Sequence, residues 1–230
     1  MALPRLYSHA LHGALHMHSL FLSALLSILT ATTLFAQSRD SHRKFIPSPY
    51  RIYSGDDIVE EEIEESFGPR RIEKKRLKKL EVYGPTHLDH VTILGHAAVY
   101  GPLEGAHISA KTLTVHGPVS VFHLQTGRLL IKGPAMINHF KIGKEVKIYG
   151  PLNAVHGACE VINVVGRDVH LSEVKTRRLI VSSKSEHPSR VELKETVISG
   201  DVIFQGTPGK VFLDESSRVT GKIKNGRLEK

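Results

Sequence analysis

Apolar and polar residues alternate along residues 80–165 in a pattern that returns every sixteen or seventeen residues. In each copy, two apolar residues lie two and four positions before a glycine, as Val82 and Leu80 do before Gly84. Side chains of a strand alternate between its two faces, so both members of a pair point to the same side. The pattern predicts one inward-facing strand per copy. The pairs are Leu80/Val82, Ala97/Val99, Leu113/Val115, Leu129/Ile131, Val146/Ile148 and Ile162/Val164.

The glycines themselves mark the repeat. They are Gly68, Gly84, Gly101, Gly117, Gly133 and Gly150, each followed by Pro, and then Gly166, which is followed by Arg167. Successive glycines are 16, 17, 16, 16, 17 and 16 residues apart, which is too regular for unrelated turns. A proline in every unit breaks helical hydrogen bonding, so helices are excluded within the repeats.

A second alternation follows each turn, with apolar residues seven and nine positions after the glycine, such as Val91 and Ile93, and a polar residue between them. Each copy therefore holds at least two short strands separated by bends. A unit this short cannot bury its own apolar face, whereas stacked copies share one core. We expect an all-β fold: a single-chain parallel β-solenoid with one coil per repeat, and equivalent residues of neighbouring coils about 4.8 Å apart.

The regular repeats are expected over residues 80–177. Beyond Gly166 the Gly-Pro marker disappears, but strand-rich stretches continue at 179–183, 196–204 and 210–226. We interpret residues 178–230 as degenerate coils and a C-terminal cap.

The N-terminal region is predicted to be a secretory signal over residues 1–36. Residues 20–36 are an uncharged apolar run, with cleavage expected after Ala36, and Met17 is an alternative start. An uncleaved membrane anchor is the competing interpretation, because the run reaches the lower length limit for a span. Either way the chain is expected to be exported, to the periplasm, the cell envelope or the medium, and membrane contact is expected only if the segment stays uncleaved.

Residues 37–79 are expected to form a linker and a charged collar. Residues 56–65 hold seven acids in ten residues and are compatible with a short helix, with Ile58 and Glu62 on one side and Gly68-Pro69 ending it. Residues Arg70 to Lys79 hold seven bases in ten. We favour local pairing between the two blocks, with contact to an anionic polymer through Arg70–Lys79 as the alternative.

A histidine stands six residues after the glycine in five successive repeats: His90, His107, His123, His139 and His156. The neighbouring inward position places this column on the outside, where the imidazoles would stack as a ladder. An inert ladder is the favoured interpretation. Zinc or another divalent transition metal is the alternative, because imidazole is a common metal ligand, with His87, His96 or His170 available as a further ligand. Sensing of pH, or contact with a ligand, is a third possibility.

Composition narrows the function. The 230-residue chain has a net charge of +8, which by itself indicates no partner and no specific contact with nucleic acid. Cys159 is the single cysteine, so disulfides and thiolate metal cages are excluded. Motifs for phosphate loops, nucleophile elbows and metalloproteases are absent from the sequence, and acids share no column in the repeats. We therefore expect no enzymatic activity and no obligatory cofactor.

Residues 80–226, with the tail ISGDVIFQGTPGKVFLDESSRVTGKIKNG at 198–226, resemble bactofilin-type polymer-forming proteins and the β-solenoid putative adhesins of bacterial envelopes. The resemblance implies a right-handed solenoid without catalysis that self-associates end to end or binds envelope components. Three functions stay open: a secreted or envelope structural protein, a metal- or glycan-binding module that uses the histidine column, and, ranked last, a polysaccharide-acting enzyme.

Overall fold

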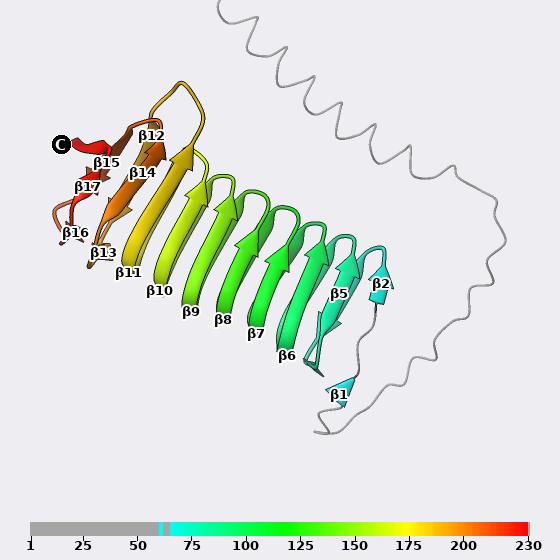
Figure 1. Ribbon diagram of the computed structural model, residues 1–230. Helices are drawn as coiled ribbons and strands as arrows, with labels where there is room; N and C mark the ends of the chain where they lie inside the picture. Colours follow the sequence, from blue (N-terminus) through cyan, green and yellow to red (C-terminus); the bar gives the residue numbers. More distant parts are fainter. Residues whose placement is uncertain (1–59, 62–64, 230) are drawn as a thin grey trace, which may run out of the picture. The chain divides into compact units, whose positions relative to one another are not determined.

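The computed structural model describes residues 60–61 and 65–229, which form a parallel β-solenoid (Figure 1). This confirms the predicted all-β class. Six long strands make up its regular part, and each of them bends at the corners of its coil. They are β6 (Thr86–Tyr100), β7 (Leu103–Val115), β8 (Val119–Ile131), β9 (Ala135–Tyr149), β10 (Leu152–Val165) and β11 (Asp168–Ser183).

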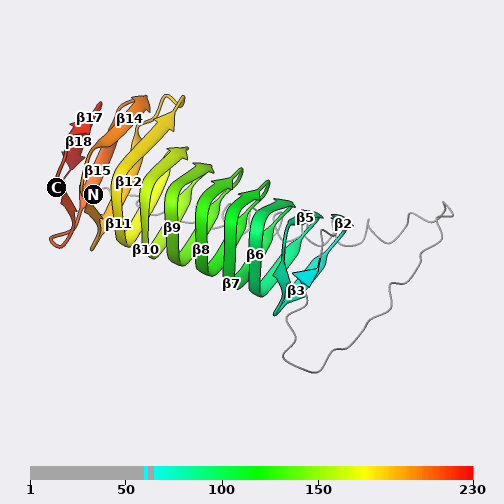
Figure 2. The same cartoon turned by 60° about the horizontal axis from the view of Figure 1, so that its bottom comes forward.

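Each sequence repeat is one coil, stacked in register on the next (Figure 2). Leu113 pairs with Leu129, sixteen residues on, and Leu129 pairs with Val146, seventeen residues on. The extra residue of the longer coils lies at one corner, where the pairing shifts between Ile93 and His96 and again opposite Thr126 and Arg128. A local bulge therefore absorbs the variation in repeat length, and every other column stays aligned.

The core is a continuous column of Leu, Ile, Val and Ala, with the predicted inward residues such as Val82, Leu113 and Ile131 almost fully buried. The glycine column has a steric cause. A Cβ atom on Gly117 would lie 2.6 Å from the Gly101 carbonyl carbon and oxygen of the preceding coil. Neighbouring coils thus approach too closely at this corner for any side chain, which explains a glycine in every repeat.

The first coils begin before Leu80, inside the segment expected to be a collar. The strands are β1 (Glu60–Glu61), β2 (Glu65–Phe67), β3 (Arg70–Glu73), β4 (Arg76–Leu77) and β5 (Leu80–Tyr83). The basic block is therefore part of the sheet, since β3 and β4 both pair with β6. Arg71 forms an ion pair with Glu73, and Lys79 Nζ lies 3.1 Å from Glu81.

The short helix expected over residues 56–65 is wrong where the structure describes this segment. Glu60 pairs with Arg76 in β4, and Glu65 pairs with Glu81 in β5, both in parallel strands. Glutamate favours helices only weakly, and pairing with an existing sheet edge overrides that preference.

The C-terminal coils are built from shorter strands joined by longer connections. Val169 pairs with Val191 and Val191 with Val211, so these coils are 22 and 20 residues long. The strands are β12 (Ser189–Lys194), β13 (Val197–Ile198), β14 (Val202–Gly206), β15 (Gly209–Leu213), β16 (Arg218–Val219), β17 (Ile223–Lys224) and β18 (Gly226–Glu229).

The predicted signal over residues 1–36 lies outside the described residues and stays a prediction. Within residues 60–61 and 65–229 there is no helix of the length and apolarity that crossing a bilayer requires.

Candidate functional site

The five histidines of the column occupy one corner of five successive coils, each in a left-handed backbone conformation. Their φ angles lie between 51° and 55°. Residues with a side chain rarely adopt this conformation, and histidine is one of those that tolerate it better than most. The same corner is occupied by Lys74 before the ladder and by Glu173 and Glu195 after it. The corner therefore requires a left-handed residue in every coil, and five of these residues are histidine.

The identical backbone geometry aligns the imidazoles in a ladder along the outside of the solenoid. Ring centroids are 4.1 Å apart between His90 and His107, 4.8 Å for each of the next two steps, and 4.7 Å between His139 and His156. The Phe122 ring meets His123 edge-on at 4.3 Å. The predicted stacking is thus confirmed, and its first step is the tightest.

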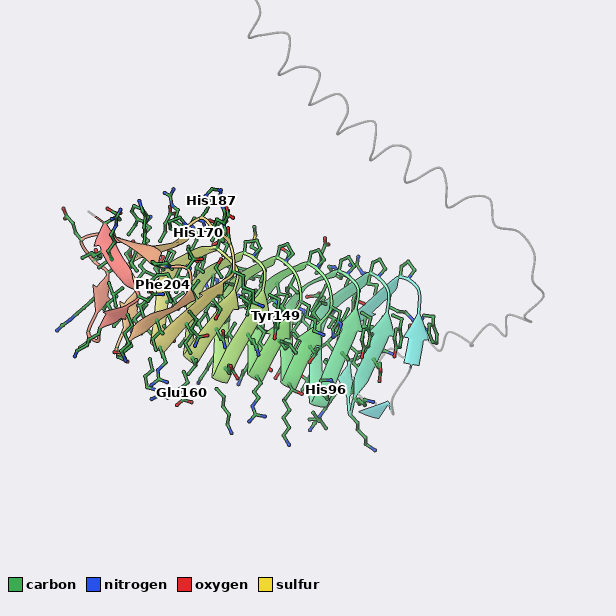
Figure 3. The ribbon with its side chains drawn as sticks, turned by 45° about the horizontal axis from the view of Figure 1, so that its top comes forward. His96, Tyr149, Glu160, His170, His187 and Phe204 are labelled. Atoms are coloured by element: carbon green, nitrogen blue, oxygen red, sulfur yellow. The ribbon has the colours of Figure 1, made fainter. Side chains whose placement is uncertain are left out.

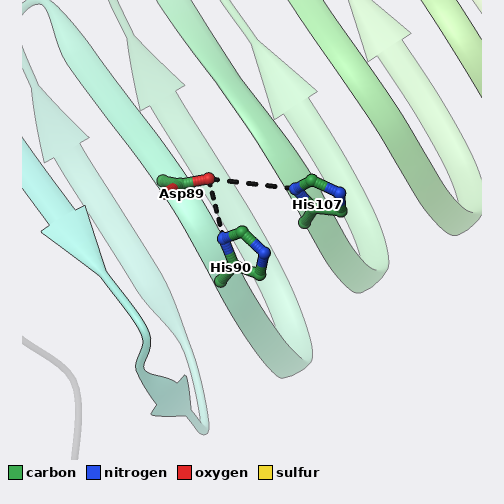
Figure 4. A group of neighbouring side chains, drawn as sticks. All are labelled: Asp89, His90 and His107. Atoms are coloured by element: carbon green, nitrogen blue, oxygen red, sulfur yellow. Dashed lines mark hydrogen bonds and ion pairs between the residues drawn. The ribbon is translucent and has the colours of Figure 1, made fainter.

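A carboxylate joins the ladder at that tightest step (Figure 4). Asp89 Oδ1 lies 2.9 Å from His90 Nδ1 and 3.9 Å from His107 Nδ1. The contact with His90 holds the pKa of Asp89 below its usual range. Within the described residues, this is the one group of three His, Cys, Asp or Glu side chains whose ligand atoms all lie within 4.8 Å of one another.

The middle and the far end of the ladder differ from its beginning. His123 has a lowered pKa, first because it is partly desolvated and then because protonated His107 and His139 would repel its charge. At the far end, His156 Nε2 lies 2.7 Å from Glu173 Oε2. His139 is paired with the side chain of Asn138. The ladder thus runs between two carboxylates, with neutral imidazoles favoured at its centre.

The histidines outside the column do not join it as further ligands. His96 and His170 project from opposite margins of the solenoid (Figure 3). His96 Nδ1 lies 2.7 Å from Thr112 Oγ1, and His170 Nδ1 lies 2.6 Å from Glu192. His87 is nearer, because its charge acts on Asp89, but it is not in the group of three.

A second ladder, made of aromatic rings, lies in the column just before the Gly-Pro corner. Phe67, Tyr83, Tyr100 and His116 follow one another at centroid distances of 5.1, 4.6 and 4.8 Å. This column was predicted to point outward, and Phe67 at its end has 76% of its surface exposed.

A shallow groove of about 380 Å³ crosses the proline corners of four coils. Its floor is mainly apolar, and polar side chains lie at its ends. It is lined by Pro102, Pro118, Pro134 and Pro151, and by side chains that include Glu104, Met136, Asp168 and His170. Cys159 lies away from this groove in the core, where burial raises the pKa of its thiol to about 11.

Sequence reasoning overlooked Asp89 and Glu173 as members of the ladder. A signal for Asp89 was present, because it is the one carboxylate that directly precedes a histidine of the column. The equivalent residues in the other four coils are Ala106, Phe122, Asn138 and Val155. For Glu173 the signal was hidden, because it lies seven residues after Gly166 rather than six.

The chain matches no family model, no curated protein and no solved structure.

Proposed function

We propose that this chain is an exported, non-catalytic structural protein that self-associates end to end, the C-terminal edge of one solenoid meeting the N-terminal edge of the next. The observation that carries the proposal is that both terminal coils present strands paired on one side only. Unpaired strand edges are templates for pairing with another chain. The resemblance to bactofilin-type polymer-forming proteins supports the same function.

The C-terminal edge consists of β16, β17 and β18. Within the described residues these strands pair with β13, β14 and β15 of the preceding coil and with no strand beyond them. The apolar column continues to this edge, where Val219 and Ile223 are only partly buried and Leu228 has 47% of its surface exposed. A second copy stacked here would extend both the sheet and the core.

The N-terminal edge consists of β1, β2 and β3, which pair with β4, β5 and β6 and with no other strand in the part of the chain that the structure describes. Residues 56–65, which include β1 and the start of β2, carry seven acids and no base. Residues 218–229 at the opposite edge carry four bases, Arg218, Lys222, Lys224 and Arg227, against Glu229. This complementarity favours head-to-tail contact over head-to-head or tail-to-tail contact.

Light scattering coupled to size-exclusion chromatography tests the proposal on the untagged chain. We expect the molar mass to rise with protein concentration and to fall as salt is added, because salt screens contacts between charged edges. A mass that stays monomeric up to the highest attainable concentration at low salt contradicts the proposal.

Charge reversal at the edge identifies the surface involved. Arg218→Glu combined with Lys222→Glu should abolish most of the concentration dependence. The matched control is Lys141→Glu combined with Lys175→Glu, which makes the same charge change on the side of the central coils. If the control pair lowers the mass as much as the edge pair, association occurs through the side of the solenoid and the end-to-end proposal fails.

A further inference from the structure

We propose that Asp89, His90 and His107 form a binding site for a single divalent transition metal ion, with zinc as the best fit. The three side chains come from two neighbouring coils: Asp89 and His90 from β6, and His107 from β7. This site lies on the outside of the solenoid, away from the edges that carry the proposed assembly, so the two proposals stand independently.

The distances suit one ion shared by the three groups. Two ligands at 2.0–2.2 Å from a tetrahedral zinc ion are about 3.4 Å apart. The observed separations from Asp89 Oδ1, 2.9 Å to His90 Nδ1 and 3.9 Å to His107 Nδ1, lie on either side of this value (Figure 4). Side-chain rotations of well under 1 Å therefore bring all three ligand atoms to the bonding distance.

The backbone holds these ligands in place before any ion arrives. Asp89 pairs with Ala106, and Val91 pairs with Ile108, so the sheet fixes the two coils on both sides of the corner. His90 and His107 share a φ of 54°, which points their rings the same way and stacks them at 20° to each other. Little conformational entropy is lost on binding, because the loop geometry exists already.

The donor set determines the class of metal. Two imidazole nitrogens and one carboxylate oxygen suit zinc and its borderline neighbours, whereas calcium and magnesium prefer oxygen ligands alone. All three side chains are partly exposed, at 33% for Asp89, 53% for His90 and 45% for His107. A fourth position therefore remains open to water or to a ligand from another molecule.

The charged neighbours set the strength of the site. Glu73 pairs with Asp89 from the preceding coil, but it already forms an ion pair with Arg71. Lys74 occupies the corner before His90 and adds positive charge, as His87 does when protonated. Lys74→Asn keeps a residue suited to the left-handed corner and removes its charge. We expect it to tighten zinc binding about two- to fivefold.

Isothermal titration of the untagged full-length chain with Zn²⁺, after treatment with a chelator, tests the site directly. We expect one ion per chain, and visible absorption bands when Co²⁺ replaces zinc. Asp89→Asn and His107→Asn should each weaken binding at least about tenfold, since even the loss of an outer-shell partner has that effect. Asparagine preserves the left-handed corner, so circular dichroism should show an intact fold.

The matched control is His139→Asn, two coils further along the same ladder, where the preceding residue is Asn138 rather than a carboxylate. We expect its zinc affinity to equal that of the unmodified chain. The proposal is overturned if the unmodified chain binds no zinc and gives no cobalt bands. It is also overturned if Asp89→Asn has no effect, or if His139→Asn weakens binding as much as His107→Asn does.

Discussion

The central coils, β6 to β10, and the C-terminal coils, β12 to β18, close their corners by different means. In the central coils the corners use backbone conformation and backbone hydrogen bonds. The ladder histidines adopt a left-handed φ, glycines permit close approach, and the Leu103 N–H donates to the Pro118 carbonyl of the next coil at 2.9 Å. The side chains at these corners therefore stay available on the outside.

In the C-terminal coils, polar side chains satisfy the backbone instead. The Glu195 N–H donates to the carboxylate of Asp214 at 3.0 Å, and the Lys222 N–H donates to Asp201 Oδ1 at 3.0 Å. Asn225 Nδ2 donates to the Gly206 carbonyl at 3.0 Å. Short polar side chains commonly complete turns in this way.

The difference explains why the ladder stops where it does. A coil of sixteen or seventeen residues closes through its backbone, so the outward side chain at each corner can repeat without cost to the fold. A coil of 20 or 22 residues has longer connections, and its corner side chains are occupied by the backbone. Repetition of an outward residue type is thus a property of the tightly closed coils.

The largest expected effect comes from filling a tight position in the central coils. A Cβ atom on Gly105 would lie 2.0 Å from the carbonyl oxygen of Leu88, whereas on Gly143 its nearest contact would be 3.7 Å away. Urea unfolding should show that Gly105→Ala lowers the free energy of unfolding by roughly 3 kcal/mol. Gly143→Ala should change it by less than about 1 kcal/mol. Equal effects would show that close approach of the coils is not what requires glycine.

The next effect concerns the C-terminal coils. Thr196 is fully buried, and its Oγ1 accepts from the Val174 N–H and donates to the Leu171 carbonyl. Thr196→Val keeps the shape but leaves that N–H unpaired, which should lower the free energy of unfolding by about 1–3 kcal/mol. Hydrogen exchange should then increase in β12 to β18 and remain unchanged in β6 to β8. Faster exchange throughout the solenoid would show that the two regions unfold as one unit.

A smaller effect tests the left-handed corner itself. His139 has a φ of 54°, which a β-branched residue adopts only with strain. His139→Val should lower the free energy of unfolding by about 1–2 kcal/mol, and His139→Asn by a few tenths. Thermal melts of the two variants compare them directly. If asparagine destabilises as much as valine, the imidazole stack contributes to stability and the corner conformation does not account for the column.

The smallest effect separates the two regions by pH. The pKa of His123 is lowered, so the unfolded chain binds its proton more readily, and stability falls as the pH drops below about 6.5. The pKa of Asp214 is also lowered, first by the Ser217 hydroxyl. Its contribution is present above about pH 3.8 and is lost in more acidic solution. Melting temperatures with chelator present should decline first between pH 7 and 5, and again below pH 4. No decline between pH 7 and 5 would contradict the lowered pKa of His123.

The sequence predicted the solenoid because its period is enforced by steric contact at one glycine per coil, which leaves a visible mark. It also predicted the stacking of His90 to His156, since equal spacing in a solenoid means alignment. It did not reveal the left-handed conformation, because histidine is only one of several residues that adopt it. It failed for residues 60–65, where the strand depends on pairing with residues 76–83 and not on local preference.

Mixing two complementary charge variants tests end-to-end assembly most directly. One variant carries Arg218→Glu and Lys222→Glu at the C-terminal edge, and the other carries Glu60→Lys and Glu61→Lys in β1 at the N-terminal edge. Light scattering should find each variant monomeric alone, because like charges then face each other across the head-to-tail contact. It should find dimers only in the mixture, where the two reversed edges attract. If the mixture stays monomeric while the unmodified chain assembles, or if either variant alone still assembles, the edges do not join as we propose.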